Sequence, residues 1–467
     1  MSYRDATLDL TEIGLGEGLA AFARDRLRYI AADDVWCVWS GQRWRQDDVL
    51  ARQEIAKAYA ETLDAAIDTI EDDKAHKAAR SAVNRARSVA GLRGMLASAS
   101  STTTIASRRE LWDADPYLLH TASGVVDLRD GSIRPATPAD LMLRSTRCAV
   151  GDGEPARWVQ FLDEITCGDA ELAAYLRACV GMTLFGDQRD HVALLCLGIG
   201  ANGKSTFLDT LRDMLGELAR VAMPDIITAR RNDPHPTEIA DLFGARLVVC
   251  TEAKDGAIDE SKIKRLTGGG TITARGIGKD PRSETLRLTL WIDGNAEPRI
   301  YGTDEGIWRR VRKIPFGAHY PEGHEKRDPL LRDKLRAEMP QILRWAIDAC
   351  ADYLRDGLPA CAAVADATRQ YRQDQDVLAE WIETSCTIDP SATVQSGTLW
   401  ASAREYLEEA GMARGWSQRR LSAELCKRGI CELHKGSGGR RELKGIKLRD
   451  GVASSARSSD HSDRYWH

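Results

Sequence analysis

The chain has 467 residues, more than one hydrophobic core usually organises, and a length of roughly 100 to 200 residues per domain predicts about three domains. Its formal net charge of -5 gives no overall electrostatic argument for nucleic-acid binding, so a nucleic-acid site would have to be a local basic patch. The cysteines form no C-x-x-C pair, which argues against a zinc ribbon, and the chain has no apolar run of about 18 residues and no signal-peptide pattern, so we expect a cytoplasmic protein.

The first part of the chain is predicted to be a mostly helical module. Aromatic residues flank a Ser40-Gly41 turn in the segment Trp36–Trp44, which is typical of two short strands, and a long helical pattern follows from about Ala51 to Ser98. A second hairpin is expected where Asp130-Gly131 separates two apolar runs. The pattern breaks at GDGEP, so this module is placed at residues 1–150.

Four further segments follow. Short apolar runs alternate with helical segments over residues 151–320, which predicts an α/β motor domain. A polar, turn-rich stretch and then amphipathic helices predict a helical connector at 321–374. Two helices, the second capped by Ser417, and two short strands predict a winged helix at 375–450. Residues 451–467 have few apolar groups and are predicted to be a disordered tail.

A phosphate-binding loop is predicted between an apolar strand at His191–Leu197 and a helical pattern. Its glycines let backbone amides surround a β-phosphate, Lys204 can bridge the β- and γ-phosphates, and the Ser205 hydroxyl can bind Mg, so ATP and Mg are the expected cofactors. A glycine loop that precedes a helix by chance is the alternative, and the loop alone does not separate a motor from a kinase or a switch. The candidate ATP-binding residues are Gly198, Gly200, Asn202, Gly203, Lys204, Ser205 and Thr206.

Two later strands are followed by polar residues. The run at 246–250 is followed by Thr251 and Glu252, and Glu252 is predicted to be the catalytic base and a second Mg ligand. Thr251 stands where many P-loop ATPases carry a Mg-linked Asp. A strand at Leu286–Ile292 leads into Asp293-Gly294-Asn295, and the Asn295 amide is predicted to sense the γ-phosphate. A carboxylate that caps a strand and a turn-forming Asn are the alternatives.

Basic residues are expected in a DNA-binding hairpin. Glycines and a Thr-Ile-Thr alternation in Ser261–Pro281 predict a hairpin that carries Arg275 and Lys279, which suits a pore loop on a phosphodiester backbone. A solvated surface hairpin would carry the same residues. The carboxy-terminal segment adds a basic group, which is a candidate DNA patch or a solvated face: Arg414, Arg419, Arg420, Lys427, Arg428, Lys435, Arg440, Arg441, Lys444 and Lys447.

An arginine cluster in Gly302–Phe316 precedes another apolar strand. Arg309 or Arg310 is predicted to reach the γ-phosphate bound by a neighbouring subunit, where a guanidinium stabilises transition-state charge. A salt-bridged structural arginine is the alternative, and the sequence does not choose between the two positions.

Four segments together resemble the helicase part of the phage and plasmid primase-helicase family, which belongs with the superfamily-three helicases and includes poxvirus relatives. They are GIGANGKSTF, RLVVCTEAKDGAIDESKIKRLTGGGTITAR, LTLWIDGNAEPRI and GTDEGIWRRVRKIPF. WCVWSGQRWRQDD and LLHTASGVVDLRDG also resemble that family's amino-terminal helical module, so the resemblance covers about residues 20–320. It implies an AAA+-like hexameric ring that moves on single-stranded DNA, usually 3′ to 5′, with hairpins in a central channel.

The resemblance implies the corresponding roles for Lys204, Ser205, Glu252, Asn295, Lys279, and Arg309 or Arg310. Many family members carry a primase domain upstream, whereas this chain starts almost directly at the helical module, so primer synthesis is expected to be absent here or to be supplied by a separate primase as a partner. The predicted function is that of an ATP-dependent DNA helicase, an ATP hydrolase for phage or mobile-element replication that acts on single-stranded or forked DNA. An origin-binding initiator and a protein-remodelling P-loop ATPase remain alternatives.

Overall fold

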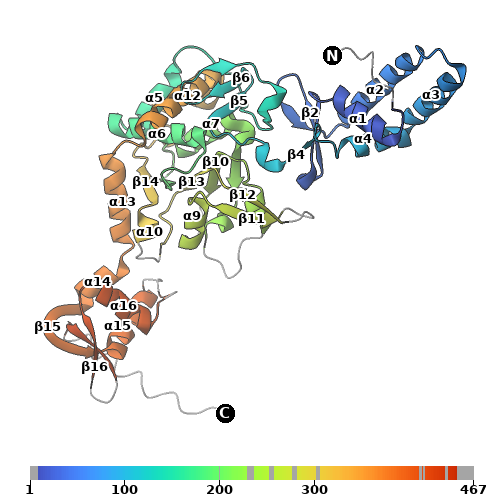
Figure 1. The fold of residues 1–467 in the computed structure, drawn as a ribbon. Coiled ribbons are helices and arrows are strands. Elements are labelled where there is room, and N and C mark those ends of the chain that lie inside the picture. Colours follow the sequence, from blue (N-terminus) through green and yellow to red (C-terminus); the bar gives the residue numbers. More distant parts are fainter. Residues whose placement is uncertain are drawn as a thin grey trace.

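The computed structural model describes residues 9–198, 200–228, 236–251, 257–275, 281–300, 305–409, 413, 416–436 and 440–449. Three bodies follow one another along this part of the chain (Figure 1). The amino-terminal body extends from one side of a larger central body, and the carboxy-terminal body lies at the opposite end. Glu252, Lys279 and the predicted tail at 451–467 lie outside the described residues.

The amino-terminal body is mostly helical. A small sheet of order β3-β2-β1-β4 accompanies its helices, and Trp39 pairs with Trp44 across the predicted turn. The helices have their own core, in which Leu19, Tyr59 and Val83 are buried together. The elements are α1 (Glu12–Phe22), β1 (Leu27–Ile30), β2 (Val35–Trp39), β3 (Trp44–Gln46), α2 (Ala51–Ile67), α3 (Asp73–Ala86), α4 (Val89–Ala99) and β4 (Ala106–Ser107).

The central body is built on a five-stranded sheet of order β14-β8-β13-β10-β9. All four pairings are parallel, and the almost uninterrupted apolar runs of β8 and β10 are buried as parallel strands require. The mixed α/β class with a parallel sheet is therefore confirmed. The strands are β8 (Ala193–Leu197), β9 (Ala219–Ala222), β10 (Leu247–Thr251), β13 (Thr289–Gly294) and β14 (Val311–Pro315).

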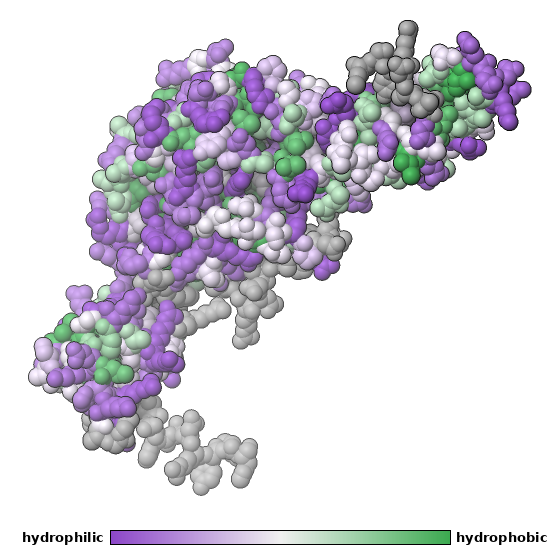
Figure 2. Space-filling view, viewed as in Figure 1, coloured by the Kyte–Doolittle hydropathy of each residue, from purple (hydrophilic) through white to green (hydrophobic). Residues whose placement is uncertain are grey.

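Helices enclose this sheet, and one hairpin projects from it. Hydrophilic residues cover most of the central body on the face shown in Figure 2, as expected when the apolar strands are enclosed. The antiparallel hairpin consists of β11 (Thr271–Arg275) and β12 (Pro281–Thr285). The helices are α5 (Ala156–Ile165), α6 (Ala170–Phe185), α7 (Lys204–Leu215), α8 (Pro236–Ala240), α9 (Glu260–Leu266) and α10 (Glu305–Trp308).

Two segments outside the predicted motor boundaries share its core. The antiparallel strands β5 (Leu118–Thr121), β6 (Gly124–Asp127) and β7 (Ile133–Arg134) fall in the predicted amino-terminal module, yet Leu119 and Val126 are buried in the same cluster as Trp158 of α5. The predicted domain boundary at residue 150 therefore does not separate two cores, because the second predicted hairpin packs on the central body.

The predicted connector is also more than a linker. It contains α11 (Leu331–Ala337), α12 (Met339–Asp356) and α13 (Ala362–Asp374). Ile342 and Ala346 of α12 are fully buried in the central core, and α12 packs along α6. The four-residue spacing of these apolar side chains gives α12 a buried face, so it is an integral part of the central body.

The carboxy-terminal body has a separate core around Trp381, Leu421 and Ile446. Ser417 caps α16 as predicted, because its side chain accepts a hydrogen bond from the Arg420 amide. The elements are α14 (Val377–Ser385), β15 (Cys386–Gln395), α15 (Ser396–Glu409), α16 (Gln418–Lys427), β16 (Glu432–Lys435) and β17 (Arg441–Leu448), with sheet order β15-β17-β16. No helix within the described ranges is long and apolar enough to cross a bilayer.

Candidate nucleotide-binding site

The loop between β8 and α7 has a backbone that depends on glycine. Gly203 precedes α7 with a φ of +87°, and a Cβ atom there would lie 2.4 Å from Cγ2 of Ile165. Both the left-handed backbone and the close approach exclude larger residues without strain. Gly200 has a φ of +90° and its neighbour Ala201 a φ of +51°, so the loop turns sharply before the helix. Ile199 lies outside the described residues.

Lys204 is buried at the start of α7, with 3% of its surface exposed. Its Nζ atom donates hydrogen bonds to the Gly198 carbonyl at 2.8 Å, to Asn202 Oδ1 at 3.1 Å and to Asn295 Oδ1 at 3.3 Å. These acceptors come from the loop and from the residue after β13. The ammonium group is therefore held at the carboxyl edge of the sheet, where ligands of open parallel sheets bind.

Asn202 contributes to the shape of the loop. Its side chain is almost fully buried, and Nδ2 donates to the Phe316 carbonyl, just after β14, at 3.4 Å. In the same segment, the Tyr320 amide donates to the Ala201 carbonyl at 2.7 Å. The chain that follows β14 thus braces the loop, a role that the sequence did not indicate. Ser205 is exposed and Thr206 is half-buried on the first turn of α7.

A carboxylate lies beside Ser205. The Ser205 hydroxyl donates to Asp293 Oδ2 at 3.4 Å, and Asp293 pairs in register with Thr251 on β10. Strand β13 runs to Gly294, further than the Leu286–Ile292 expected, so Asp293 is part of the strand. Burial raises the pKa of Asp293, while the Lys204 ammonium and the Ser205 hydroxyl act in the opposite direction. The sequence prediction treated this residue only as the end of a strand.

The two candidate arginines lie at the opposite edge of the sheet. Arg310 immediately precedes β14, whose first residue pairs with Ala193 at the start of β8. The predicted phosphate loop follows Leu197, at the other end of that strand, and a five-residue strand spans about 13 Å. Arg309 is exposed, whereas Arg310 is half-buried and donates to the Gly306 carbonyl at 2.8 Å. The structure does not bring either arginine to Lys204 within one chain.

The hairpin β11–β12 places Arg275 at its far end, where it is exposed and pairs with Pro281. One residue from that end, Arg282 pairs with Ala274, and its Nη1 lies 3.1 Å from Asp33 Oδ1 of the amino-terminal body. Asp33 Oδ2 also lies 3.3 Å from Nε of Arg109. Arg282 thus joins the hairpin to the amino-terminal body, and the Asp33 carboxylate that it contacts is shared with Arg109.

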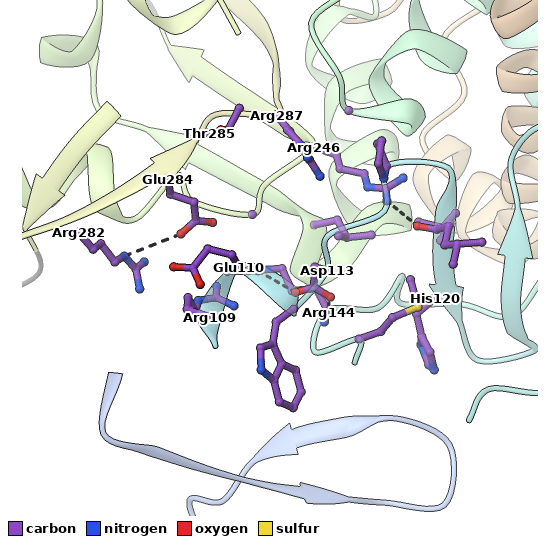
Figure 3. A pocket seen from close by; sticks show the side chains of 18 of the residues that line it. Arg109, Glu110, Asp113, His120, Arg144, Arg246, Arg282, Glu284, Thr285 and Arg287 are labelled. Atoms are coloured by element: carbon purple, nitrogen blue, oxygen red, sulfur yellow. Dashed lines mark hydrogen bonds and ion pairs between the residues drawn. The ribbon is translucent and has the colours of Figure 1, made fainter. Parts of the chain in front are cut away.

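A cavity of about 570 Å³ opens beside this junction (Figure 3). Arg144 Nη1 lies 3.0 Å from Asp113 Oδ2, and the half-buried Arg246 donates to the Leu118 carbonyl at 2.6 Å. The charged side chains that line the cavity are nearly balanced in number: Asp33, Arg109, Glu110, Asp113, Arg144, Arg246, Arg282, Glu284 and Arg287. The cavity is therefore a polar junction between the amino-terminal body, the hairpin and the central body, away from Lys204.

Comparisons with known proteins match two parts of the chain. Residues 16–167 match a family model described as D5 N terminal like, and residues 196–310 match a family of unknown function. The chain is 27% identical over 293 residues to the "Putative helicase L207/L206" of Acanthamoeba polyphaga mimivirus, an alignment that covers 58% of this chain and 30% of the viral protein. It is 24% identical over 314 residues to the "Putative primase C962R" of African swine fever virus, with 60% and 32% covered.

A third relative is the "Putative helicase 022R" of Frog virus 3, which is 27% identical over 244 residues, 48% of this chain and 25% of that protein. The chain spans about a third or less of the length of these relatives. Among solved structures, the apo structure of the NrS-1 C terminal region has a TM-score of 0.47 and 8% identity, over 93% of this chain and 99% of that chain. The chain is thus similar to primase-helicase-like proteins of large DNA viruses.

Proposed function

We propose that the chain is an ATP-dependent DNA helicase that works as a hexameric ring on single-stranded DNA and moves 3′ to 5′. The observation that carries the proposal is the position of Lys204, which is held at the carboxyl edge of a parallel sheet by the loop and by Asn295. The viral relatives named as helicases or primases support DNA replication as the setting. The central body then corresponds to an AAA+-like motor.

The residues at this edge suit a nucleoside triphosphate. Positive-φ glycines and the amino end of α7 direct amide groups toward the loop, and the Lys204 ammonium adds a charge for the phosphates. The exposed Ser205 hydroxyl fits as a ligand of Mg, which would neutralise phosphate charge when bound. Glu252 directly follows the end of β10, the strand beside β13, so we assign it the activation of the attacking water.

The arginine positions support an assembly in which subunits share a site. Because Arg309 and Arg310 lie at the sheet edge opposite Lys204, a role on the γ-phosphate requires a neighbouring subunit. Of the two, Arg309 is the better candidate, since it is exposed while Arg310 donates to the Gly306 carbonyl of its own chain. Hydrolysis would then depend on ring formation.

DNA is proposed to contact the hairpin and the carboxy-terminal body. Arg275 is exposed at the far end of β11, and Lys279 belongs to the connection between the two strands. In the carboxy-terminal body, α15 and α16 followed by β16 and β17 have the order of a winged helix. Arg428 and Lys447 form ion pairs with Asp376 and Asp389, so the DNA surface is assigned to the other basic residues.

Strand displacement tests the proposal. Duplexes with a 3′ or a 5′ single-stranded tail are incubated with ATP and the wild-type protein, Lys204→Ala, or Lys57→Ala as a control for loss of one exposed lysine. We expect unwinding of the 3′-tailed duplex alone, lost in Lys204→Ala and retained in Lys57→Ala. ATP hydrolysis that DNA does not change, without unwinding, would instead indicate a protein-remodelling ATPase. A footprint on one specific duplex would indicate an origin-binding initiator.

A further inference from the structure

The carboxylate next to Ser205 comes from β13 and not from β10. Thr251, the last residue of β10, is exposed and uncharged, and it stands where many P-loop ATPases carry a Mg-linked Asp. Asp293 on β13 pairs in register with Thr251 on β10. Strand β13 lies between β10 and β8, so Asp293 is closer than Thr251 to the strand that leads into the loop. The negative charge is therefore present at the site, but on the adjacent strand.

We propose that Asp293, together with the Ser205 hydroxyl, holds the divalent cation that accompanies the nucleotide phosphates. The inference rests on the proposed function, because it assumes that the loop binds a nucleotide. Mg²⁺ prefers oxygen ligands at about 2.1 Å in octahedral geometry, which places neighbouring ligand oxygens about 3 Å apart. Ser205 Oγ and Asp293 Oδ2 are 3.4 Å apart, so a small movement brings both to one cation.

The surroundings of Asp293 favour a cation. The side chain is half-buried, and no ion pair within the described ranges involves it. Lys204 acts on it electrostatically, but the ammonium hydrogens are directed to Gly198, Asn202 and Asn295. A partly desolvated carboxylate is costly unless charge compensates it, and a bound cation supplies that charge. The assignment replaces Glu252 as the protein carboxylate on the cation and leaves Glu252 to the attacking water.

Cation affinity tests the inference directly. The full chain is saturated with a non-hydrolysable ATP analogue, and binding of Mn²⁺ to the complex is followed by the loss of the free Mn²⁺ signal in electron paramagnetic resonance. We expect Asp293→Asn to weaken Mn²⁺ binding at least about tenfold. Nucleotide affinity in EDTA should stay within about twofold of wild type, since Lys204 and the loop amides remain. Asp209→Asn is the matched control, because Asp209 lies on α7, near enough to Asp293 to act on it electrostatically, and pairs with Arg212 and Arg332.

The outcomes separate the inference from the proposed function. If Lys204→Ala leaves nucleotide binding unchanged, the nucleotide site itself is wrong. If Lys204→Ala abolishes binding while Asp293→Asn binds Mn²⁺ like wild type, only the role of Asp293 is overturned. If Asp293→Asn lowers nucleotide affinity equally with and without the cation, the inference is also overturned, because Asp293 would then shape the loop and not hold the cation. Recovery of Mn²⁺ affinity in the double variant Asp293→Asn, Thr251→Asp would support a carboxylate requirement that either strand can meet.

Discussion

Asn295 accepts a hydrogen bond from Lys204, with 3.3 Å between Oδ1 and Nζ, and so joins the end of β13 to the first turn of α7. The amide and the ammonium group lie at the same edge of the sheet, although 91 residues separate them in the chain. If a bound ligand accepts the hydrogen bond of the Lys204 ammonium, Asn295 Oδ1 loses this donor and needs another one. Asn295 is therefore positioned to respond to whether Lys204 is bound to a phosphate.

Replacing Asn295 should lower the rate of ATP hydrolysis more than the affinity for ATP. Asn295→Ala removes a preorganised dipole near the phosphates, and we expect kcat to fall roughly 100-fold with KM changed far less. Asn295→Asp keeps an acceptor for Lys204 but adds negative charge near the γ-phosphate, so it should be impaired as well. Steady-state hydrolysis measures both variants. Full activity in Asn295→Asp would mean that Asn295 only anchors Lys204.

Lys204 and Arg309 lie at opposite edges of the sheet, so each ATP site is predicted to take its lysine from one subunit and its arginine from the next. Variants of the two residues should therefore complement each other in mixed rings. Arg309→Ala should lower ATP hydrolysis by about 1,000-fold, whereas Arg310→Ala should act mainly on stability, because Arg310 bonds to the Gly306 carbonyl. Neither Arg309→Ala nor Lys204→Ala rings should hydrolyse ATP alone. Rings mixed from the two variants should regain activity, because some interfaces then combine an intact loop with an intact arginine.

Native mass spectrometry provides the control for this mixing experiment by verifying that both variants assemble and exchange subunits. Activity that stays absent in demonstrably mixed rings would contradict the shared site. Activity of Arg309→Ala alone at the wild-type level would remove Arg309 from the mechanism.

The loop was predictable from sequence, because the pattern that defines it is local. An apolar run, spaced glycines and Lys204 lie within 14 residues, at 191–204, and the structure has strand β8, the positive-φ glycines and α7 in that order. The α/β class also followed from alternating apolar runs and helical segments. The catalytic assignments to Glu252 and Lys279 stay predictions, since both residues lie outside the described ranges.

The contacts that depend on strand order were not predictable. Asp293 reaches Ser205 across 88 residues only because β13 lies between β8 and β10. Strand β15 was missed for a related reason: its residues are mostly exposed, so it lacks an apolar alternation, and it is defined by pairing with the distant β17. The amphipathic pattern of α12 is local and was predicted, whereas its packing along α6 depends on the tertiary fold and was not.

The pair formed by Asp33 and Arg282 should stabilise the hairpin. Asp33 is 12% exposed and also contacts Arg109, so Asp33→Ala removes the carboxylate between two guanidinium groups. Arg282 is 32% exposed, which limits the expected cost to about 1 to 2 kcal/mol. Amide hydrogens of β11 and β12 should then exchange about five- to thirtyfold faster with deuterium. Asp64→Ala is the control, since Asp64 pairs with Arg80 and Arg87 inside the amino-terminal body.

His120 lies between the central and amino-terminal bodies in its neutral form. Nε2 lies 2.9 Å from the Gln42 carbonyl, and Nδ1 lies 2.9 Å from the Ser145 hydroxyl. A carbonyl oxygen only accepts, so Nε2 carries the proton and Nδ1 accepts from Ser145. Burial lowers the pKa of His120 below that of an exposed histidine, while the bond to Gln42 acts in the opposite direction.

This lowered pKa predicts a loss of stability in mild acid. The unfolded chain takes up the His120 proton near pH 6.5, whereas the folded chain takes it up only at lower pH. Between the two pKa values the unfolded state binds more protons, so the stabilisation present above about pH 6.5 is lost as the pH falls and levels off below the folded pKa. Urea unfolding followed by hydrogen exchange in β2 and β3, which flank Gln42, and in β5, which contains His120, should show a smaller decline of stability from pH 7.5 to 5 in His120→Gln than in wild type. Equal declines in the two proteins would place the acid sensitivity on other groups.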